Sequence, residues 1–208
     1  MRNAPQLASF RGSAVVPHLD AVAALRIAVF RAWPYLYAGD AGYERDYLAA
    51  YAASPDSVFV LAFDGDRVVG ASTGLPLADD TEAFSRPFVE RGLPVETVFY
   101  FGESVLLPPY RGLGLGHAFF DRREAHARAL GRFRWTAFCA VDRALDDPRR
   151  PPGHRDHDVF WRQRGYARRP DMRMRLPWCE VPPAGGALAG EDTLHDLTFW
   201  LREWSTDT

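Results

Sequence analysis

The sequence predicts one α/β domain over residues 1–208. Runs rich in valine and phenylalanine, typical of strands, alternate with segments whose apolar residues recur at helical spacing. A glycine-rich loop stands between one such run and one such helical segment. The chain is 47% hydrophobic and 13% aromatic, which is enough apolar surface for one buried core.

The first half of the chain predicts two helices and a hairpin. Apolar residues in 20–33 fall on one face at helical spacing, and three tyrosines in 43–52 lie four residues apart. These tyrosines are most simply core residues, although one of them could reach a ligand. Residues 57–63 and 67–73 are strand-like runs joined by a short Asp-Gly turn. Residues 75–96 are polar and irregular, and could line a site or form a plain surface loop.

The second half continues the alternation. A third strand over 98–107 ends at two prolines, which cannot donate ladder hydrogen bonds. A helix over 117–130 follows the glycine-rich loop, and residues 133–141 predict a buried strand. The remaining expected segments are a loop over 142–153, a short helix over 156–164, a strand over 172–178, a flexible connector over about 182–190, and a last strand over about 194–204, whose pattern also fits a helix.

The composition excludes several classes of protein and chemistry. The net charge of -2 gives no overall attraction to nucleic acid or to an anionic membrane. The chain has no lysine, so it has neither a Schiff-base lysine nor the lysine of a Walker phosphate loop. Its longest apolar stretch is broken by Arg26, short of the roughly 20 apolar residues that span a membrane. Two cysteines do not make a disulfide framework, and we expect a cytoplasmic protein.

The loop Arg111-Gly112-Leu113-Gly114-Leu115-Gly116-His117 is the strongest functional signal. Alternate glycines let a phosphate approach the main chain closely, and a helix that starts here adds unpaired N–H donors and the positive end of its dipole. The G-x-G-x-x-G spacing of dinucleotide loops fails, because the third glycine position holds His117 or Phe119. The remaining pattern is Arg-x-x-Gly-x-Gly.

At these residues the sequence resembles the GNAT superfamily of acyl-CoA-dependent N-acyltransferases. The order of elements is also similar, including a short second motif that ends at Gly165-Tyr166 about 50 residues later. The resemblance implies a mixed, mostly antiparallel sheet that is flanked by helices and splayed where CoA binds. It also implies acetyl-CoA as cosubstrate.

The resemblance further implies which residues hold CoA. Pantetheine would pair with the third strand, the pyrophosphate would lie on residues 113–117, and Arg111 would add positive charge, unless it is a surface arginine that closes the turn. The implied cofactor-binding residues are Val105, Leu106, Leu107, Arg111, Gly112, Leu113, Gly114, Leu115, Gly116 and His117.

Glu103 is the candidate base for transfer to an amine, which must lose a proton. Alternation along the strand places it on the same face as Val105. A carboxylate inside an apolar strand is costly unless it is paired or functional, so a structural ion pair with an arginine is the alternative.

The acid is harder to identify. Many members of the family carry a tyrosine four residues before the glycine of the Gly-aromatic pair, but here that position is Trp161, which cannot donate a proton in this role. Tyr166, His157 and His154 are nearby substitutes, and a thiolate is a good enough leaving group to need no dedicated acid. We take Tyr166 as the second catalytic candidate.

Three other features have simpler explanations. The run from His154 to Asp158 could bind a metal but is better explained as a polar helix start. Cys139 lies among apolar residues and is expected to be a small buried hydrophobe. The pair Arg149-Arg150 could meet an acidic substrate or the 3′-phosphate of CoA, or form a solvated turn.

The sequence therefore predicts an N-acetyltransferase that moves an acetyl group from acetyl-CoA to a primary amine in a ternary complex. The alternatives are an inactive CoA-binding sensor of the same fold and a nucleotide-phosphate binder that uses the same loop. An antibiotic, a polyamine, an amino acid or a protein N-terminus could each be the acceptor, and we expect neither nucleic acid nor a membrane as partner. Trp200 and Trp204 indicate either a homodimer surface or a buried strand face.

Overall fold

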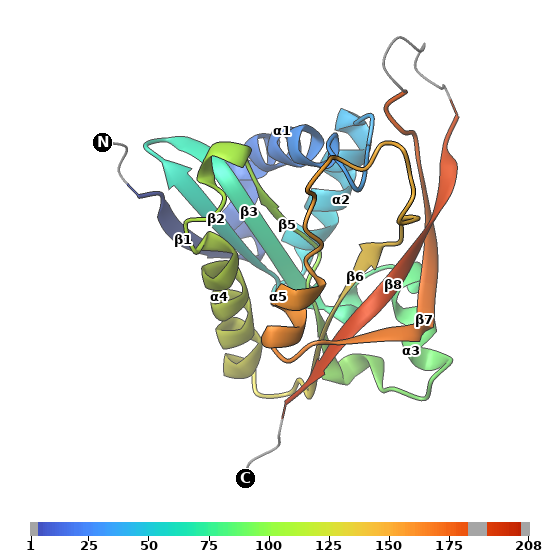
Figure 1. Cartoon of the computed structure of the whole chain (residues 1–208). Helices are drawn as coiled ribbons and strands as arrows, with labels where there is room; N and C mark the ends of the chain where they lie inside the picture. The colour runs from blue at the N-terminus through green and yellow to red at the C-terminus, as the bar shows by residue number, and fades with distance from the viewer. Residues whose placement is uncertain (1–3, 183–190, 205–208) are drawn as a thin grey trace.

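The computed structural model describes residues 4–182 and 191–204 and is built around one mixed sheet (Figure 1). The strands run in the order β1-β2-β3-β4-β6-β8-β7, and β5 pairs with β3 beside this path. Every pairing is antiparallel except that of β4 with β6. The mixed, mostly antiparallel sheet expected from the sequence is confirmed. The strands are β1 (Gln6–Arg11), β2 (Val58–Asp64), β3 (Arg67–Pro76), β4 (Val98–Tyr100), β5 (Ser104–Leu106), β6 (Trp135–Val141), β7 (Ala167–Trp178) and β8 (Thr193–Glu203).

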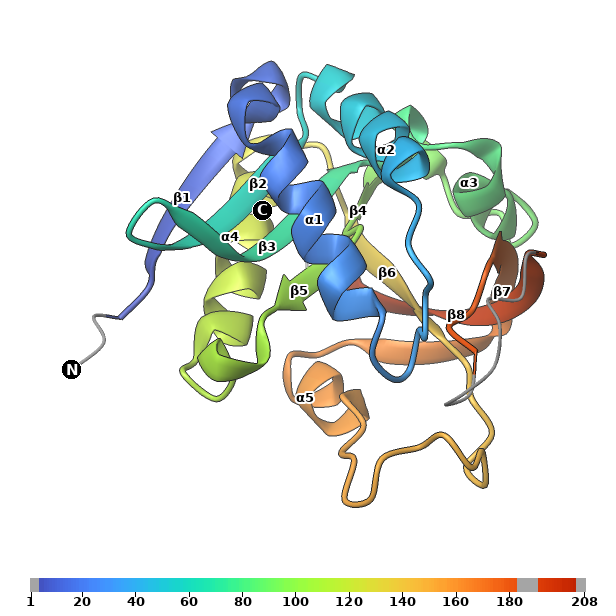
Figure 2. The ribbon, with the colours of Figure 1, turned by 90° about the horizontal axis from the view of Figure 1, so that it is seen from above.

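Helices cover both faces of the sheet and bury two separate cores (Figures 1 and 2). The first core joins the sheet to α1, α2 and α3, and the second joins it to α4 and α5. The α-helices are α1 (Leu19–Phe30), α2 (Ala41–Ala53), α3 (Glu82–Val89), α4 (Leu115–Ala129) and α5 (Asp158–Gln163). Four 3-10 turns complete the elements: η1 (Gly12–His18), η2 (Leu77–Asp79), η3 (Val95–Thr97) and η4 (Pro108–Tyr110).

Two elements were missed by the sequence prediction. β1 is a half-buried edge strand that pairs with β2, and its weak alternation gives little signal. The segment 75–96, expected to be irregular, contains α3, which is only eight residues long and includes Pro87. Tertiary packing stabilises this helix, because the fully buried Phe88 packs edge-on against Phe199.

The expected third strand is two strands. β4 pairs with both β3 and β6 as far as Tyr100, whereas β5 pairs only with β3 in the described part of the chain. Gly102 lies at the break, where a Cβ atom would approach Thr73 Oγ1 to 2.6 Å, so only glycine fits there. Figure 2 shows β5 and β6 diverging beyond this point.

Other predictions agree closely with the structure. The last segment is a strand as chosen, and the β2–β3 hairpin turns at Gly65 with a φ of +59°. Trp200 is only 1% exposed, so it belongs to a buried strand face and gives no support to a dimer surface. Of the expected connector over 182–190, residues 183–190 lie outside the described part of the chain.

The expectation that no stretch is long and apolar enough to cross a membrane is wrong by length and composition: the helical stretch Gly12–Phe30 passes this test, because Asp20 and Arg26 are its only charged residues. A core helix of a soluble protein passes the same test. Val15 and Val22 are fully buried in the first core, and Arg26 is buried in an ion-pair network described below.

Candidate active site

The glycine-rich loop adopts a backbone that glycine alone accepts readily. Gly112 and Gly114 have φ angles of +77° and +78°, in the left-handed region. A Cβ atom at either position would meet nothing within 4 Å, so the φ angle and not crowding requires glycine. Gly114 is the N-cap of α4, and the buried Leu115 anchors the first turn in the second core.

The main-chain amides of residues 112–117 make no hydrogen bond with the described part of the protein. The first amide of this region with a main-chain partner is that of Ala118, which donates to Gly114. Six consecutive donors at the positive end of a 15-residue helix therefore remain available to an anion.

The side chains around the loop are exposed. Leu113 is 60% exposed, and Arg111 donates from Nε to the Leu106 carbonyl at 3.1 Å. The ring of His117 packs against Phe160 with 4.8 Å between centroids, and its Nδ1 lies 3.4 Å from Arg164. Arg111 thus joins the loop to β5 and keeps its positive charge near the free amides.

β5 has a free edge beside this loop. In the described ranges it pairs with β3 alone. Glu103 accepts a hydrogen bond from the amide of Thr73, and the amide of Leu107 donates to Val69. Because the polar groups of successive strand residues alternate between edges, those of Ser104 and Leu106 turn away from β3.

This geometry differs from one expectation. The amide of Leu107 donates to Val69, and its carbonyl accepts from Tyr110 at 3.0 Å, so both groups are used within the protein. By the same alternation the main-chain groups of Val105 face β3 and not the free edge. The groups available for an added strand are therefore those of Ser104, which was not among the expected residues, and the amide of Leu106, whose carbonyl accepts from Arg111.

Glu103 is 6% exposed and lies in an ion-pair network beneath α1 and α2. Its Oε2 is 2.5 Å from Arg26 Nη1 and accepts a hydrogen bond from the Tyr47 hydroxyl at 3.2 Å. Its Oε1 is buried and has no hydrogen-bond partner. The structural ion pair is therefore real, but one oxygen is left over for another proton donor.

Arg26 also pairs with Glu44, which is fully buried on α2. One cation thus faces two carboxylates away from water. Burial raises the pKa of Glu44 above its usual value, although Arg26 opposes this shift. The pKa of Arg26 is raised by the two carboxylates in spite of its burial. The three side chains together carry one excess negative charge, which a further cation or a proton would neutralise.

Arg123 of α4 fixes the break between β4 and β5. It is 1% exposed and donates from Nη1 to the carbonyls of Thr73 and Glu103 at 3.1 and 2.9 Å, and from Nη2 to Ser104 Oγ at 2.8 Å. Its guanidinium also lies 4.2 Å from the centre of the Phe101 ring. Burial lowers its pKa to about 10. The signal for this role was an arginine on the face of the predicted helix that also carries Phe119, Phe120 and Ala127.

Tyr166 lies in the second core and not at the free edge of β5. It is 2% exposed, and its hydroxyl bonds to Thr136 Oγ1 at 3.0 Å and to Glu124 at 3.3 Å. Burial raises its pKa above the usual value. These contacts make Tyr166 a structural residue and give no support to a role as acid for the thiolate.

The other candidates occupy ordinary positions. Trp161 packs edge-on against Phe138 and Trp200 in the second core. Cys139 lies 3.0 Å from the Tyr100 hydroxyl, and burial raises its thiol pKa to about 12, so it is unreactive. Within residues 4–182 and 191–204, no group of three or more His, Cys, Asp or Glu side chains could hold a metal.

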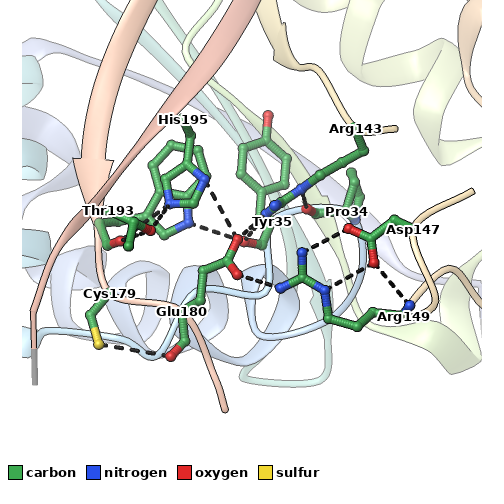
Figure 3. A network of polar contacts seen from close by, with 10 residues as sticks. Pro34, Tyr35, Arg143, Asp147, Arg149, Cys179, Glu180, Thr193 and His195 are labelled. Atoms are coloured by element: carbon green, nitrogen blue, oxygen red, sulfur yellow. Dashed lines mark hydrogen bonds and ion pairs between the residues drawn. The ribbon is translucent and has the colours of Figure 1, made fainter. Parts of the chain in front are cut away.

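Arg149 belongs to a polar network that connects three distant segments (Figure 3). It pairs with Asp147 at 2.7 Å and also with Glu180, whose carboxylate binds Arg143 at 2.6 Å. Arg143 in turn donates to the carbonyls of Pro34 and Tyr35. Both arginines are therefore already paired, Arg149 within this network and Arg150 with Asp156.

The comparisons with known proteins agree with this geometry. The model of the acetyltransferase (GNAT) family matches residues 24–147, more than half of the chain. No curated protein is similar enough in sequence to match it.

Solved acetyltransferases share the fold at low sequence identity. One from Streptococcus agalactiae is 13% identical with a TM-score of 0.59, and the alignment covers 97% of this chain and 99% of that one. A ribosomal-protein-alanine N-acetyltransferase from Brucella melitensis is 14% identical with a TM-score of 0.57 and coverage of 95% and 99%. A putative acetyltransferase from Salmonella typhimurium, solved with its cofactor acetyl-CoA, is 12% identical with a TM-score of 0.53 and coverage of 97% and 94%.

Proposed function

Because the chain belongs to the acetyltransferase (GNAT) family, we propose that it transfers an acetyl group from acetyl-CoA to a primary amine, directly and in a ternary complex. The observation that carries the proposal is the row of unpaired amides over residues 112–117, next to the free edge of β5. These amides and the start of α4 suit a diphosphate, and the strand edge suits the amide groups of pantetheine.

In this proposal each part of CoA meets a different set of residues. The pyrophosphate accepts hydrogen bonds from the amides of the loop, with Arg111 and His117 beside it. Pantetheine pairs with the main chain at the free edge of β5, through Ser104 and the amide of Leu106. The amide of Leu106 faces the free edge and is suited to stabilise the oxyanion of the thioester carbonyl.

The acyl-transfer step uses few side chains. The amine nitrogen attacks the thioester carbon, the C–N bond forms, and the C–S bond breaks to release CoA as a thiolate. The proton lost by the amine goes to Glu103 Oε1, directly or through one water, because this oxygen has no other partner. The thiolate takes its proton from solvent, so no protein acid is required.

A second candidate function is an inactive CoA-binding module of the same fold. Two observations favour it: Trp161 stands where many relatives have a tyrosine, and the hydroxyl of Tyr166 is held in the core. The nucleotide-phosphate binder, which lacks support from the fold, would be recognised by its ligand preference.

We further propose that residues 1–208 act as one domain in the cytoplasm, without nucleic acid or a membrane as partner. The net charge of -2 and the core packing of α1 support this.

Release of the CoA thiol, measured over a panel of amines, tests the proposal. We expect turnover with at least one amine and thermal stabilisation by CoA. Tight CoA binding with no turnover would favour the inactive module. Thermal stabilisation by ATP and not by CoA would contradict the proposal that the loop binds the diphosphate of CoA.

A further inference from the structure

A cavity of about 270 Å³ lies between α2, the end of β3, α3 and β7. Four aromatic rings line it: Tyr43, Tyr47 and Tyr51 from α2, and Phe84 from α3. The tyrosine rings form a continuous row, with centroids 6.2 and 4.6 Å apart. The volume is slightly below the range of about 300–1,000 Å³ for drug-sized ligands, so it suits a small molecule or the end of a longer one.

The same cavity is lined by Asp46, Asp79 and Asp80, and by no arginine or histidine. None of these carboxylates takes part in an ion pair in residues 4–182 and 191–204. Asp79 accepts a hydrogen bond from Ser54, and Asp80 accepts one from the Tyr51 hydroxyl at 3.2 Å and one from the amide of Thr81. These contacts position the two carboxylates without neutralising them.

Unpartnered polar atoms lie beside the hydroxyl groups of Tyr47 and Tyr51, behind the residues that line the cavity. The position that a Cβ atom of Gly102 would take is 2.6 Å from Thr73 Oγ1 and 2.8 Å from the hydroxyl oxygens of both Tyr47 and Tyr51. Thr73 is fully buried and its Oγ1 has no hydrogen-bond partner. Oε1 of Glu103, whose Oε2 binds the Tyr47 hydroxyl, also has none. Because these oxygens have no donor within the described part of the protein, the region behind the two tyrosine hydroxyls is rich in acceptors, which favours a ligand that supplies N–H groups.

From these observations we propose that the cavity is the acceptor site and that the acceptor is a small organic cation, an ammonium group on an apolar or aromatic body. The proposal rests on the acetyltransferase function proposed above. Aromatic rings and unpaired carboxylates together favour a cation over a neutral or anionic group. Asp80 is the residue that determines this preference, and Tyr47 connects the site to Glu103.

The electrostatics of Asp80 agree with the assignment. Burial raises the pKa of Asp80 to about 6, and the negative charge of Glu103 adds to the shift. The two carboxylates are therefore near enough to influence each other, and an ammonium group between them would relieve the excess negative charge.

Three compounds with the same ring test the charge preference: phenethylamine, phenethyl alcohol and phenylacetate. We expect calorimetry on the full chain with CoA present to show that the amine binds at least about tenfold more tightly than the alcohol, and that the acid binds most weakly. Asp80→Asn should reduce the affinity for the amine about tenfold and leave that for the alcohol unchanged. Equal binding of the amine and the alcohol would overturn the proposal.

Two further variants keep the result interpretable. Asp46→Asn, on the exposed part of α2, should weaken amine binding about threefold and carries the test if Asp80→Asn does not fold. Asp66→Asn, in the exposed β2–β3 turn outside the cavity, changes the net charge equally and should change nothing. If Asp66→Asn lost as much affinity for the amine as the cavity variants do, the proposed acceptor site would be contradicted.

The two proposals fail differently. Suppose that the chain acetylates phenethylamine or another amine and that the KM for this amine is the same in the Asp80 and Asp46 variants. This result would contradict the acceptor site and leave the acetyltransferase function in place. Amine binding that depends on these residues, without CoA binding, would contradict the acetyltransferase function and leave the cation site in place.

Discussion

The loop before α4 and the cavity beside α2 present different chemistry to a ligand. Over residues 112–117 the loop offers main-chain amides, and its side chains are largely exposed. The cavity offers rings and carboxylates from α2, η2 and α3. A main-chain site can bind a common group such as a diphosphate in many proteins of different sequence, whereas a side-chain site selects one acceptor.

The two regions meet at Glu103 and Gly102, where β4 ends and β5 begins. Arg123 holds this junction from the loop side, and Arg26 and Tyr47 contact it from the cavity side. The comparison predicts that substitutions at the junction lower turnover. Substitutions in the loop should weaken only the binding of CoA, and substitutions in the cavity should weaken only the binding of the acceptor.

The largest effect is expected at the junction. Glu103→Gln keeps the shape of the side chain but removes the base, so turnover should fall about 100-fold to 10,000-fold, the range typical of a general base. The affinity for CoA, measured by calorimetry, should be unchanged. Glu96→Gln, an exposed glutamate in η3, is the control and should behave as wild type. Unchanged turnover of Glu103→Gln at all pH values would remove Glu103 from the mechanism.

The next effect is on stability. Arg123→Met removes a buried charged donor from the carbonyls of Thr73 and Glu103, and the free energy of unfolding in urea should fall by about 2–3 kcal/mol. Arg122→Met, the neighbouring exposed arginine on α4, should cost less than about 0.5 kcal/mol. If both variants lose the same stability, Arg123 does not hold the junction.

A smaller effect is expected on CoA affinity, and it distinguishes the glycine-rich loop from other glycine turns of the fold. Gly114→Ala places a Cβ atom at a φ of +78°, which costs about 1–2 kcal/mol and should shift the amides and weaken CoA binding about tenfold. Gly92 is a matched control with a φ of +67° and open space around it, far from the loop. Gly92→Ala should lose similar stability but keep its affinity for CoA. Equal CoA affinity in the two variants would show that the loop does not bind CoA.

The smallest effect concerns pH. Because burial raises the pKa of Asp80 to about 6, the folded chain holds this proton more tightly than the unfolded chain does. The contribution of Asp80 to stability therefore increases as the pH falls from about 6 to 4 and is lost as the pH rises through 6. Relative to Asp80→Asn, wild type should gain about 1 kcal/mol between pH 7 and pH 4.5, with allowance for solvent screening. A wild-type gain no larger than that of Asp80→Asn would contradict the raised pKa.

The loop was predictable from the sequence because its strand, glycines and helix are contiguous in the chain. The break in the strand over 98–107 was not, since the short Gly102-Glu103-Ser104 interruption lies between two apolar runs and the residue that fixes the break, Arg123, lies 20 residues beyond Glu103. The partners of Glu103 were missed for the same reason: Arg26 lies on a helix 77 residues earlier. Two of the three carboxylates of the cavity, Asp79 and Asp80, lie in the segment 75–96, which carries no sequence motif.

The central claim is that the amides of residues 112–117 bind the diphosphate of CoA. The most direct measurement is a titration of the nitrogen-15-labelled chain with CoA, followed by amide NMR, in which the glycine signals of the loop fall in a distinct region of the spectrum. The account predicts that the amide signals of Gly112, Gly114 and Gly116 shift strongly while that of Gly92 does not. CoA binding that leaves the three loop signals in place would contradict it.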